Sequence, residues 1–168
     1  PTDVRDAAQC RHLVDVTVEA FGRVGALVNS AYVPGGFERV AAADLDDWRA
    51  TLEVNLFGTM QLTQAVIPVM KQQGGGAIVM INSMVTRKPM PYQGGYAVSK
   101  SALTTATAQL ALELGAFRIR VNSAYMGWMW GPPVENYLIA AAARQGTTVE
   151  ALAAGIAKSI PLGRIPDD

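Results

Sequence analysis

Three short apolar runs along the chain become polar as they end, over residues 26–31, 77–83 and 119–124. Aliphatic runs of this length predict strands that are buried on both faces of a sheet. Polar residues at the ends of such strands are typical of the carboxyl edge of a parallel sheet, where α/β proteins bind their ligands. We therefore expect the functional residues of this chain at that edge.

Longer segments with apolar residues at helical spacing separate and flank these runs. We expect helices over residues 7–22, 44–71, 95–115, 134–143 and 149–158. Asp44 is a suitable N-cap for the second helix. The apolar stripe of that helix consists of Leu45, Trp48, Leu52, Leu56 and Met60. Three glycines at 74–76 follow a helix and precede a strand, so they predict a turn; a phosphate-binding loop has the reverse order. The alternation predicts one α/β domain with a parallel sheet over residues 1–168.

The composition is that of a globular protein, and it narrows the classes of partner. Half of the residues are apolar and 17% are charged. Fourteen basic residues balance 14 acidic ones, so net charge favours neither nucleic acid nor a membrane surface. A single cysteine, Cys10, and a single histidine, His12, provide neither an internal disulfide nor a metal cluster. The sequence shows no membrane-spanning run and no signal-peptide pattern, so we expect a cytoplasmic protein.

Four polar residues stand at spacings that suggest chemistry. Tyr96 and Lys100 are four apart on a predicted helix and share one of its faces. Ser83 closes the second predicted strand, and Asn55 lies in the helix before that strand. Taken singly, each residue has a structural interpretation: Ser83 as a strand-end cap, Asn55 as a solvated helix position, Tyr96 as a core-edge aromatic and Lys100 as a surface charge. Their order and spacing together favour a joint catalytic role.

In that order and spacing, the four residues resemble the pattern of the short-chain dehydrogenase/reductase family, an Asn, a strand-end Ser and Tyr-x-x-x-Lys. The resemblance covers roughly the whole chain. It implies a Rossmann-like doubly wound parallel sheet, NAD or NADP as cofactor, and hydride transfer between a secondary alcohol and a carbonyl. It also implies that Tyr96 is the acid/base, that Ser83 binds the substrate oxygen and that Lys100 binds the nicotinamide ribose. Asn55 would mark a local helix break whose carbonyl holds a water for proton relay.

Further positions of the family pattern imply contacts with the cofactor. Asp3 and Val4 resemble the pair that meets the adenine ring, and residues 29–31 resemble a family strand end in which Ser30 and Tyr32 replace an Asn and a Gly. Met126 stands where the family has a Pro. The predicted cofactor-binding residues are Asp3, Val4, Asn29, Ser30, Ala31, Tyr96, Lys100, Met126, Gly127 and Met129.

The glycine-rich turn with which this family binds pyrophosphate has no counterpart in the sequence. We therefore expect the sheet to be incomplete in this chain, with family segments before residue 1 and after residue 168. We also expect residues 1–168 by themselves to be unstable and inactive, because open sheet edges would leave apolar surface uncovered.

The pairing of Tyr96 with Lys100 has an electrostatic consequence. A free phenol, with a pKa near 10, exchanges protons poorly at neutral pH. An ammonium about 4 Å away stabilises a phenolate by about 4 kcal/mol at an effective dielectric of 20, against about 1 kcal/mol in bulk water. Because one pKa unit corresponds to about 1.4 kcal/mol, a shielded pair is expected to lower the pKa of Tyr96 by up to about three units.

Apolar loops flank the predicted site and bear on the substrate. The residues expected to contact substrate are Met84, Tyr92, Trp128 and Trp130. Thioethers and aromatic rings suit a bulky apolar alcohol or ketone, and the alternative is that several of them pack in the core or in a dimer contact. Two other functions stay open: a catalytically silent relative that serves assembly or ligand binding, and a reductase of an acyl-carrier-bound 3-ketoester.

Two of the predicted helices suggest self-association. Residues 44–71 and 95–115 carry more apolar or small side chains than one sheet face can cover. Family members pair these helices, so the resemblance implies a homodimer or homotetramer.

Overall fold

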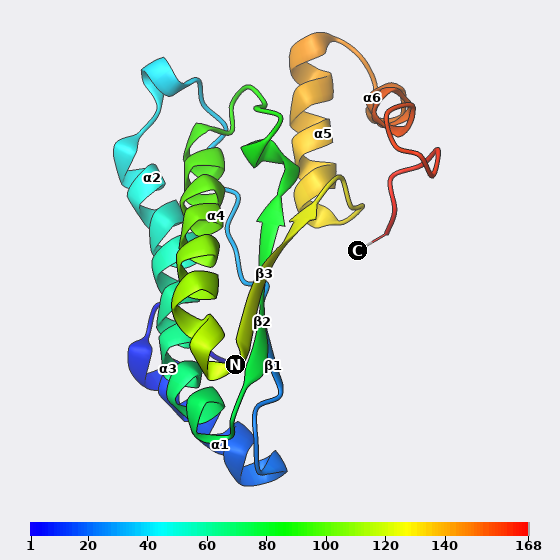
Figure 1. The fold of residues 1–168 in the computed structure, drawn as a ribbon. Helices are drawn as coiled ribbons and strands as arrows, with labels where there is room; N and C mark the ends of the chain where they lie inside the picture. The colour runs from blue at the N-terminus through cyan, green and yellow to red at the C-terminus, as the bar shows by residue number, and fades with distance from the viewer. Residues whose placement is uncertain (168) are drawn as a thin grey trace. The chain divides into compact units, whose positions relative to one another are not determined.

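The computed structural model describes residues 1–167; residue 168, the last of the predicted domain, lies outside the described residues. The chain divides into two compact units, Pro1–Tyr125 and Met126–Asp168, and each is treated by itself. Figure 1 shows the elements in chain order. In the first unit they are α1 (Ala7–Phe21), β1 (Ala26–Asn29), α2 (Leu45–Leu52), α3 (Thr59–Gln72), β2 (Gly76–Ser83), α4 (Gly94–Leu114) and β3 (Ile119–Met126), the last residue of which begins the second unit.

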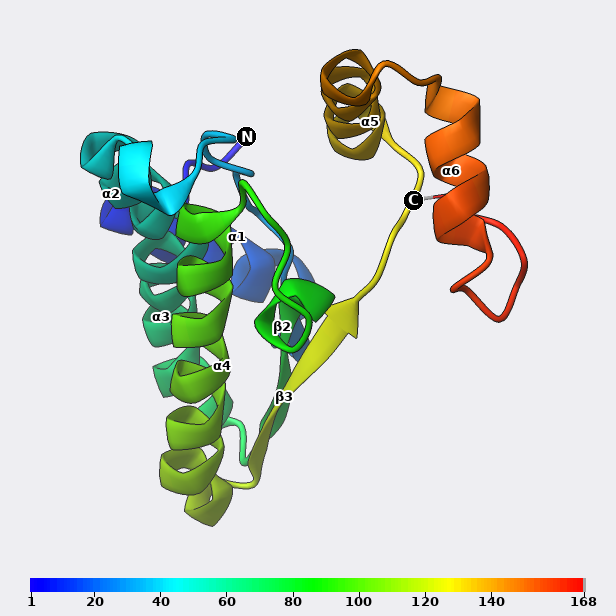
Figure 2. The ribbon, with the colours of Figure 1, turned by 90° about the horizontal axis from the view of Figure 1, so that it is seen from above.

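The three strands form one sheet in the order β1-β2-β3, with helices as the connections. β1 pairs with β2 in parallel, and Asn29 lies opposite Met80. Figure 2 shows α3 and α4 on the same side of β2 and β3. This arrangement confirms the predicted α/β fold with a parallel sheet. It brings the ends of β1 and β2 to one edge, beside the start of α4.

Within the first unit, helices cover only one face of the sheet (Figure 2). Ile78, Met80 and Asn82 of β2 are buried, whereas Val28 of β1 is 58% exposed. The expectation of strands buried on both faces is therefore wrong for this unit. Aliphatic side chains stand on both faces of these strands, but α1, α3 and α4 supply a single covering layer. The buried core includes Cys10, Val66, Met70, Ile78, Met80 and Leu103.

The predicted helix over residues 44–71 is interrupted by a π-helical turn over Glu53–Gly58, which joins α2 to α3. Asp44 caps α2 as expected, because its carboxylate accepts a hydrogen bond from Asp46 N at 2.8 Å. Of the predicted apolar stripe, Leu56 and Met60 pack against the core, whereas Leu45 is 58% exposed. The buried residues include the polar Thr51, Asn55, Thr59 and Thr63.

Two glycines allow the first turn of α4 to lie against α2. A Cβ on Gly94 would lie 2.7 Å from Trp48 Cζ2, and a Cβ on Gly95 would lie 2.8 Å from Trp48 Cδ1. Only residues without a Cβ permit this approach. The contact fixes the backbone immediately before Tyr96. At the other end of the fold, Gly75 has φ +141° and lies against Arg118, which confirms the predicted turn.

The second unit contains α5 (Pro132–Gln145) and α6 (Val149–Ala157), which pack against each other. Pro132 begins α5, where a missing N–H costs nothing. Trp130 N donates to Pro166 O, and the Trp128 and Tyr137 rings lie 5.6 Å apart between centroids. Across residues 1–167, no helix has both the length and the apolar character needed to cross a membrane.

Candidate active site

Ser83 ends β2 with its hydroxyl held by the following turn. The Ser83 Oγ accepts a hydrogen bond from Val85 N at 3.3 Å, and Thr86 Oγ1 donates to Ser83 O at 3.0 Å. An oxygen that accepts from the backbone still has its own proton to donate. The preceding residue, Asn82, is buried, and its Oδ1 accepts from Ser83 N at 3.0 Å. The strand end is thus held from both sides.

Lys100 is buried beside Tyr96, one turn further along α4. Its side chain extends toward β2, where Nζ donates a hydrogen bond to Ile81 O at 2.8 Å. The residue is only 3% exposed, and burial lowers the pKa of Lys100 to about 8. Nζ lies 5.8 Å from the centroid of the Tyr96 ring. The predicted pair therefore shares one helix face and approaches the strand that carries Ser83.

The pKa of Tyr96 is raised, chiefly because burial disfavours the phenolate. A hydrogen bond with the Ser83 side chain acts in the opposite direction, and the charge of Tyr32 adds to the increase. The predicted lowering by Lys100 is therefore wrong for the chain itself. Loss of hydration on burial has the largest effect on the pKa of Tyr96.

Asn55 is fully buried within the π-helical turn, so it is not a solvated helix position. Its Oδ1 accepts from Val33 N at 2.8 Å, and its Nδ2 donates to Val33 O at 3.0 Å. The same Nδ2 donates to Ser99 Oγ at 3.0 Å, next to Lys100 in α4. The local helix break implied by the resemblance is present. The Asn55 side chain links the segment after β1 to α4.

The residues at and just after the end of β1 differ in burial. Asn29 is buried, and its Nδ2 donates to Thr63 Oγ1 at 3.0 Å, so its side chain points into the helix layer. Ser30 and Ala31 are exposed. Tyr32, 42% exposed, approaches the predicted pair: its ring centroid lies 6.1 Å from that of Tyr96.

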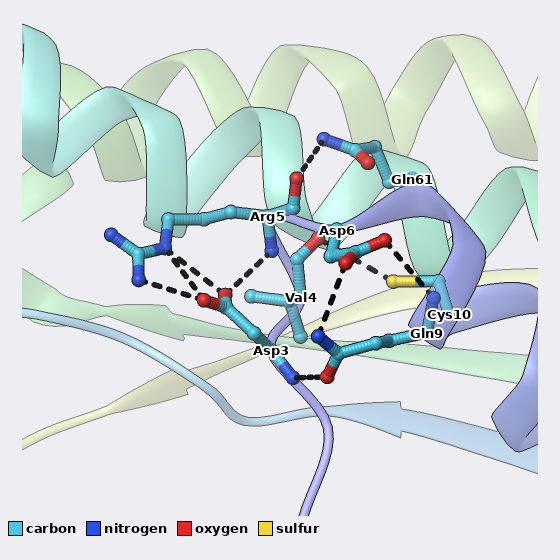
Figure 3. Close-up of polar contacts among 7 residues, drawn as sticks. All are labelled: Asp3, Val4, Arg5, Asp6, Gln9, Cys10 and Gln61. Carbon is cyan, nitrogen blue, oxygen red and sulfur yellow. Dashed lines mark hydrogen bonds and ion pairs between the residues drawn. The ribbon is translucent and has the colours of Figure 1, made fainter.

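Asp3 and Val4 lie in an N-terminal segment held by α1 and α3 (Figure 3). Arg5 Nη2 donates a hydrogen bond to Asp3 Oδ2 at 2.7 Å, and this bond holds the pKa of Asp3 at about 2. The segment is anchored by Gln61 Nε2, which donates to Arg5 O at 3.3 Å. A Cβ on Gly58 would lie 2.7 Å from Val4 Cγ2, so Val4 packs directly on the π-helical turn. The adenine contact predicted for both residues stays a prediction.

The remaining predicted residues fall in both units. Met84 is half-buried in the turn after β2, and Tyr92 precedes α4 with a φ of +68°, which is unusual for a residue with a side chain. The Arg39 guanidinium lies 5.5 Å from the Tyr92 ring centroid. Five others belong to the second unit: Met126, Gly127, Trp128, Met129 and Trp130. Their roles toward cofactor and substrate stay predictions.

Three residues of the site were not predicted from the sequence as participants. Tyr32 was noted only as a replacement, although an aromatic residue just after a strand end is a usable signal. Asn82 stabilises the strand end through its Nδ2, which donates to Thr104 Oγ1 of α4 at 2.9 Å. Ser99 bridges Asn55 and α4, since its Oγ donates to Tyr96 O at 2.8 Å. No spacing rule identifies either of these two.

Comparison with known proteins agrees with this fold and this residue pattern. The family model described as short chain dehydrogenase matches residues 1–138. The chain therefore belongs to the short-chain dehydrogenase family. The match includes all four residues predicted to be catalytic.

Relatives and solved structures refine the comparison. The chain is 43% identical over 122 residues to an uncharacterized NAD-dependent oxidoreductase of Mycobacterium tuberculosis (strain CDC 1551 / Oshkosh), covering 72% of this chain and 44% of the relative. It is 39% identical over 124 residues to a D-threitol dehydrogenase of Mycolicibacterium smegmatis, covering 72% and 46%. A crystal structure of NAD+-bound xylitol dehydrogenase superimposes with a TM-score of 0.89 at 30% identity, covering 99% of this chain and 66% of that one. The chain thus spans about half the length of these two curated relatives.

Proposed function

We propose that the protein is an oxidoreductase that uses NAD or NADP to interconvert a secondary alcohol and a carbonyl compound, with Tyr96 as the acid/base. The observation that carries this proposal is the buried Lys100 ammonium beside Tyr96, next to the strand end that presents the Ser83 hydroxyl. Burying an ammonium is costly, and proteins rarely do so without a use for it.

The raised pKa of Tyr96 suits the direction of carbonyl reduction. A phenol that keeps its proton at neutral pH can donate it to the oxygen that becomes negative as the carbonyl carbon receives a hydride. One C–H bond and one O–H bond form on the substrate as the π bond of the carbonyl and the O–H bond of Tyr96 break. The hydride would come from the reduced nicotinamide, and Tyr96 is left as phenolate. The Lys100 ammonium stabilises that phenolate, since with a pKa of about 8 it is largely charged at pH 7.

Ser83 positions the substrate oxygen in this proposal. Its Oγ already accepts from Val85 N, and its own proton, which it donates to the Tyr96 side chain in the chain alone, would turn to the carbonyl oxygen when substrate binds. Because Ser83 also forms a hydrogen bond with the Tyr96 side chain, one substrate oxygen could be reached by both hydroxyls. Alcohol oxidation is the reverse, with Tyr96 as the base.

The donors on the chain fit a nicotinamide nucleotide. An ammonium has three N–H donors, and Lys100 uses one on Ile81 O, which leaves donors for ribose hydroxyls. When bound, the nicotinamide would supply or accept the hydride. The names of the relatives favour NAD over NADP. The other cofactor positions proposed are Asp3, Val4, Asn29, Ser30, Ala31, Met126, Gly127 and Met129.

The substrate is proposed to be a small-molecule alcohol or carbonyl compound. Threitol and xylitol, which appear in the names of two similar proteins, are polar polyols. The prediction of a bulky apolar substrate rests instead on Met84, Tyr92, Trp128 and Trp130. Comparing turnover of short polyols with that of apolar secondary alcohols decides between the two classes. A cytoplasmic location and a homo-oligomeric assembly are further parts of this proposal.

Tyr96→Phe in the intact polypeptide tests the function. We expect at least about a tenfold loss of turnover with a responsive alcohol or ketone, because the variant removes only the transferable proton. Cofactor affinity, measured by quenching of tryptophan fluorescence, should be nearly unchanged. The matched control is Tyr125→Phe, which removes a phenol from β3 instead. Retention of more than about a tenth of the activity in Tyr96→Phe excludes Tyr96 as the acid/base.

A further inference from the structure

Tyr32 forms a second aromatic face over the buried ammonium. Lys100 Nζ lies 5.7 Å from the Tyr32 ring centroid and 5.8 Å from that of Tyr96. Both distances are within the range at which an aromatic face attracts a cation. The two rings are tilted by 57° with centroids 6.1 Å apart, so they form two walls of one site.

The backbone next to Tyr32 is held by buried hydrogen bonds. Val33 exchanges two hydrogen bonds with the side chain of Asn55, at 2.8 and 3.0 Å, and Asn55 is fully buried. The same amide is bonded to Ser99 of α4. The segment that carries Tyr32 is therefore fixed to the helix that carries Tyr96 and Lys100.

We propose that Tyr32 is a positioning residue of this site, whose ring covers the Lys100 ammonium beside Tyr96 and limits the access of water to both groups. The inference rests on the proposed function, because that function gives the Tyr96–Lys100 pair its role. It goes further in assigning a task to a residue that departs from the family pattern, which has glycine at this position.

Removing the ring has a defined effect on the ionisation of Tyr96. The groups that change its pKa are the Ser83 side chain from β2, which lowers it, and Tyr32, which raises it, in addition to burial. Lys100 of α4 is the charged neighbour on the same helix face. Without the Tyr32 ring, Tyr96 is less buried and the charge of Tyr32 is absent. Each change makes the phenolate easier to form, so the pKa of Tyr96 falls.

The test is a titration of the intact protein without cofactor or substrate. Tyrosines labelled with 13C at Cζ give resonances whose shifts report ionisation, and the chain has five of them. Tyr96→Phe assigns the relevant resonance. We expect the Tyr96 midpoint to fall by about 0.5–1 pH unit in Tyr32→Gly and by less in Tyr32→Phe, which keeps the ring. In active enzyme, the pH profile of kcat for Tyr32→Gly should move in the same direction.

The matched control is Phe21→Ala, which removes an aromatic ring that is 78% exposed at the end of α1. Its Tyr96 midpoint should equal that of the wild type. If Tyr32→Gly does not fold, Tyr32→Leu, which fills part of the space without an aromatic face, should lower the midpoint in the same direction. An unchanged or higher midpoint in the folded variant overturns the proposal. The titration needs no turnover, so it tests the role of Tyr32 separately from the proposed function. The proposed function fails if Tyr96→Phe stays active.

Discussion

Replacing Lys100 with Met removes a buried ammonium and keeps a side chain of similar length. In the folded chain the pKa of Lys100 is about 8 because burial disfavours the charged form, whereas the ordinary value is 10.5. Below about pH 8 both the folded and the unfolded states hold the Lys100 proton, and above about pH 10.5 both have lost it. Between these pH values, the unfolded chain binds a proton that the folded chain has released. The Lys100 contribution to the free energy of unfolding therefore rises with pH between about 8 and 10.5.

The size of this contribution follows from the two pKa values. The difference between 10.5 and about 8 corresponds to about 3 kcal/mol, at about 1.4 kcal/mol per unit. Lys100→Met lacks this pH dependence. Near neutral pH the variant should be more stable than the wild type by up to that amount, less the contribution of the hydrogen bond to Ile81 O. Its advantage should shrink as the pH rises.

Urea denaturation of the intact protein at about pH 7.5, 8.5 and 9.5 measures this trend. The wild type, Lys100→Met and the exposed control Lys88→Met are compared at each pH. We expect the stability difference between Lys100→Met and the wild type to decrease with pH, and that for Lys88→Met to stay constant. A Lys100→Met difference that is constant or grows with pH would refute the argument that burial lowers the pKa of this lysine.

Three further predictions concern the scaffold. Asn55→Ala should lower the free energy of unfolding by about 2–5 kcal/mol in urea titrations, because its buried partners lose their hydrogen bonds; a loss below about 1 kcal/mol would contradict this. Gly95→Ala should cost about 1–3 kcal/mol in the same assay through the clash with Trp48, while Gly115→Ala, which meets nothing within 4 Å, should be neutral, and equal stability of the two variants would argue against the clash. The exposed apolar side chains Leu45 of α2, Phe57 of the π-helical turn, and Val98 and Leu112 of α4 predict a homo-oligomer by light scattering, and a monomer at micromolar concentration would remove that prediction.

The elements of the first unit were largely predictable because strands and helices differ in period. The run over residues 77–83 and the observed β2 differ by one residue, and the helix expected over 95–115 is α4 shifted by one. Asp44 marked its helix start through capping chemistry. What the local pattern could not provide was which face is covered, since Val28 is as aliphatic as Ile78 and yet is exposed.

The sequence identified the residues of the candidate site, but it did not predict the direction in which the pKa of Tyr96 is shifted. The sequence order of Asn55, Ser83, Tyr96 and Lys100 identified the residues, and helical spacing placed the last two on one face. The pKa of Tyr96 was predicted in the wrong direction because its sign depends on burial, which a sequence does not display. The part played by Tyr32 depends on a ring contact between residues 64 positions apart, beyond any local pattern.

The π-helical turn over Glu53–Gly58 sets the rotational phase between the helices on either side of it. Each residue of an α-helix advances about 100° around the axis, so a turn with one extra residue offsets α3 from α2 by about that angle. This offset lets α2 pack on α4 while α3 packs on α1. Deleting one residue from the turn would restore an even helical pitch and rotate all of α3 out of alignment with the sheet. Chain length in these six residues is therefore under a constraint separate from that on their identity, and a deletion there should be more harmful than most substitutions.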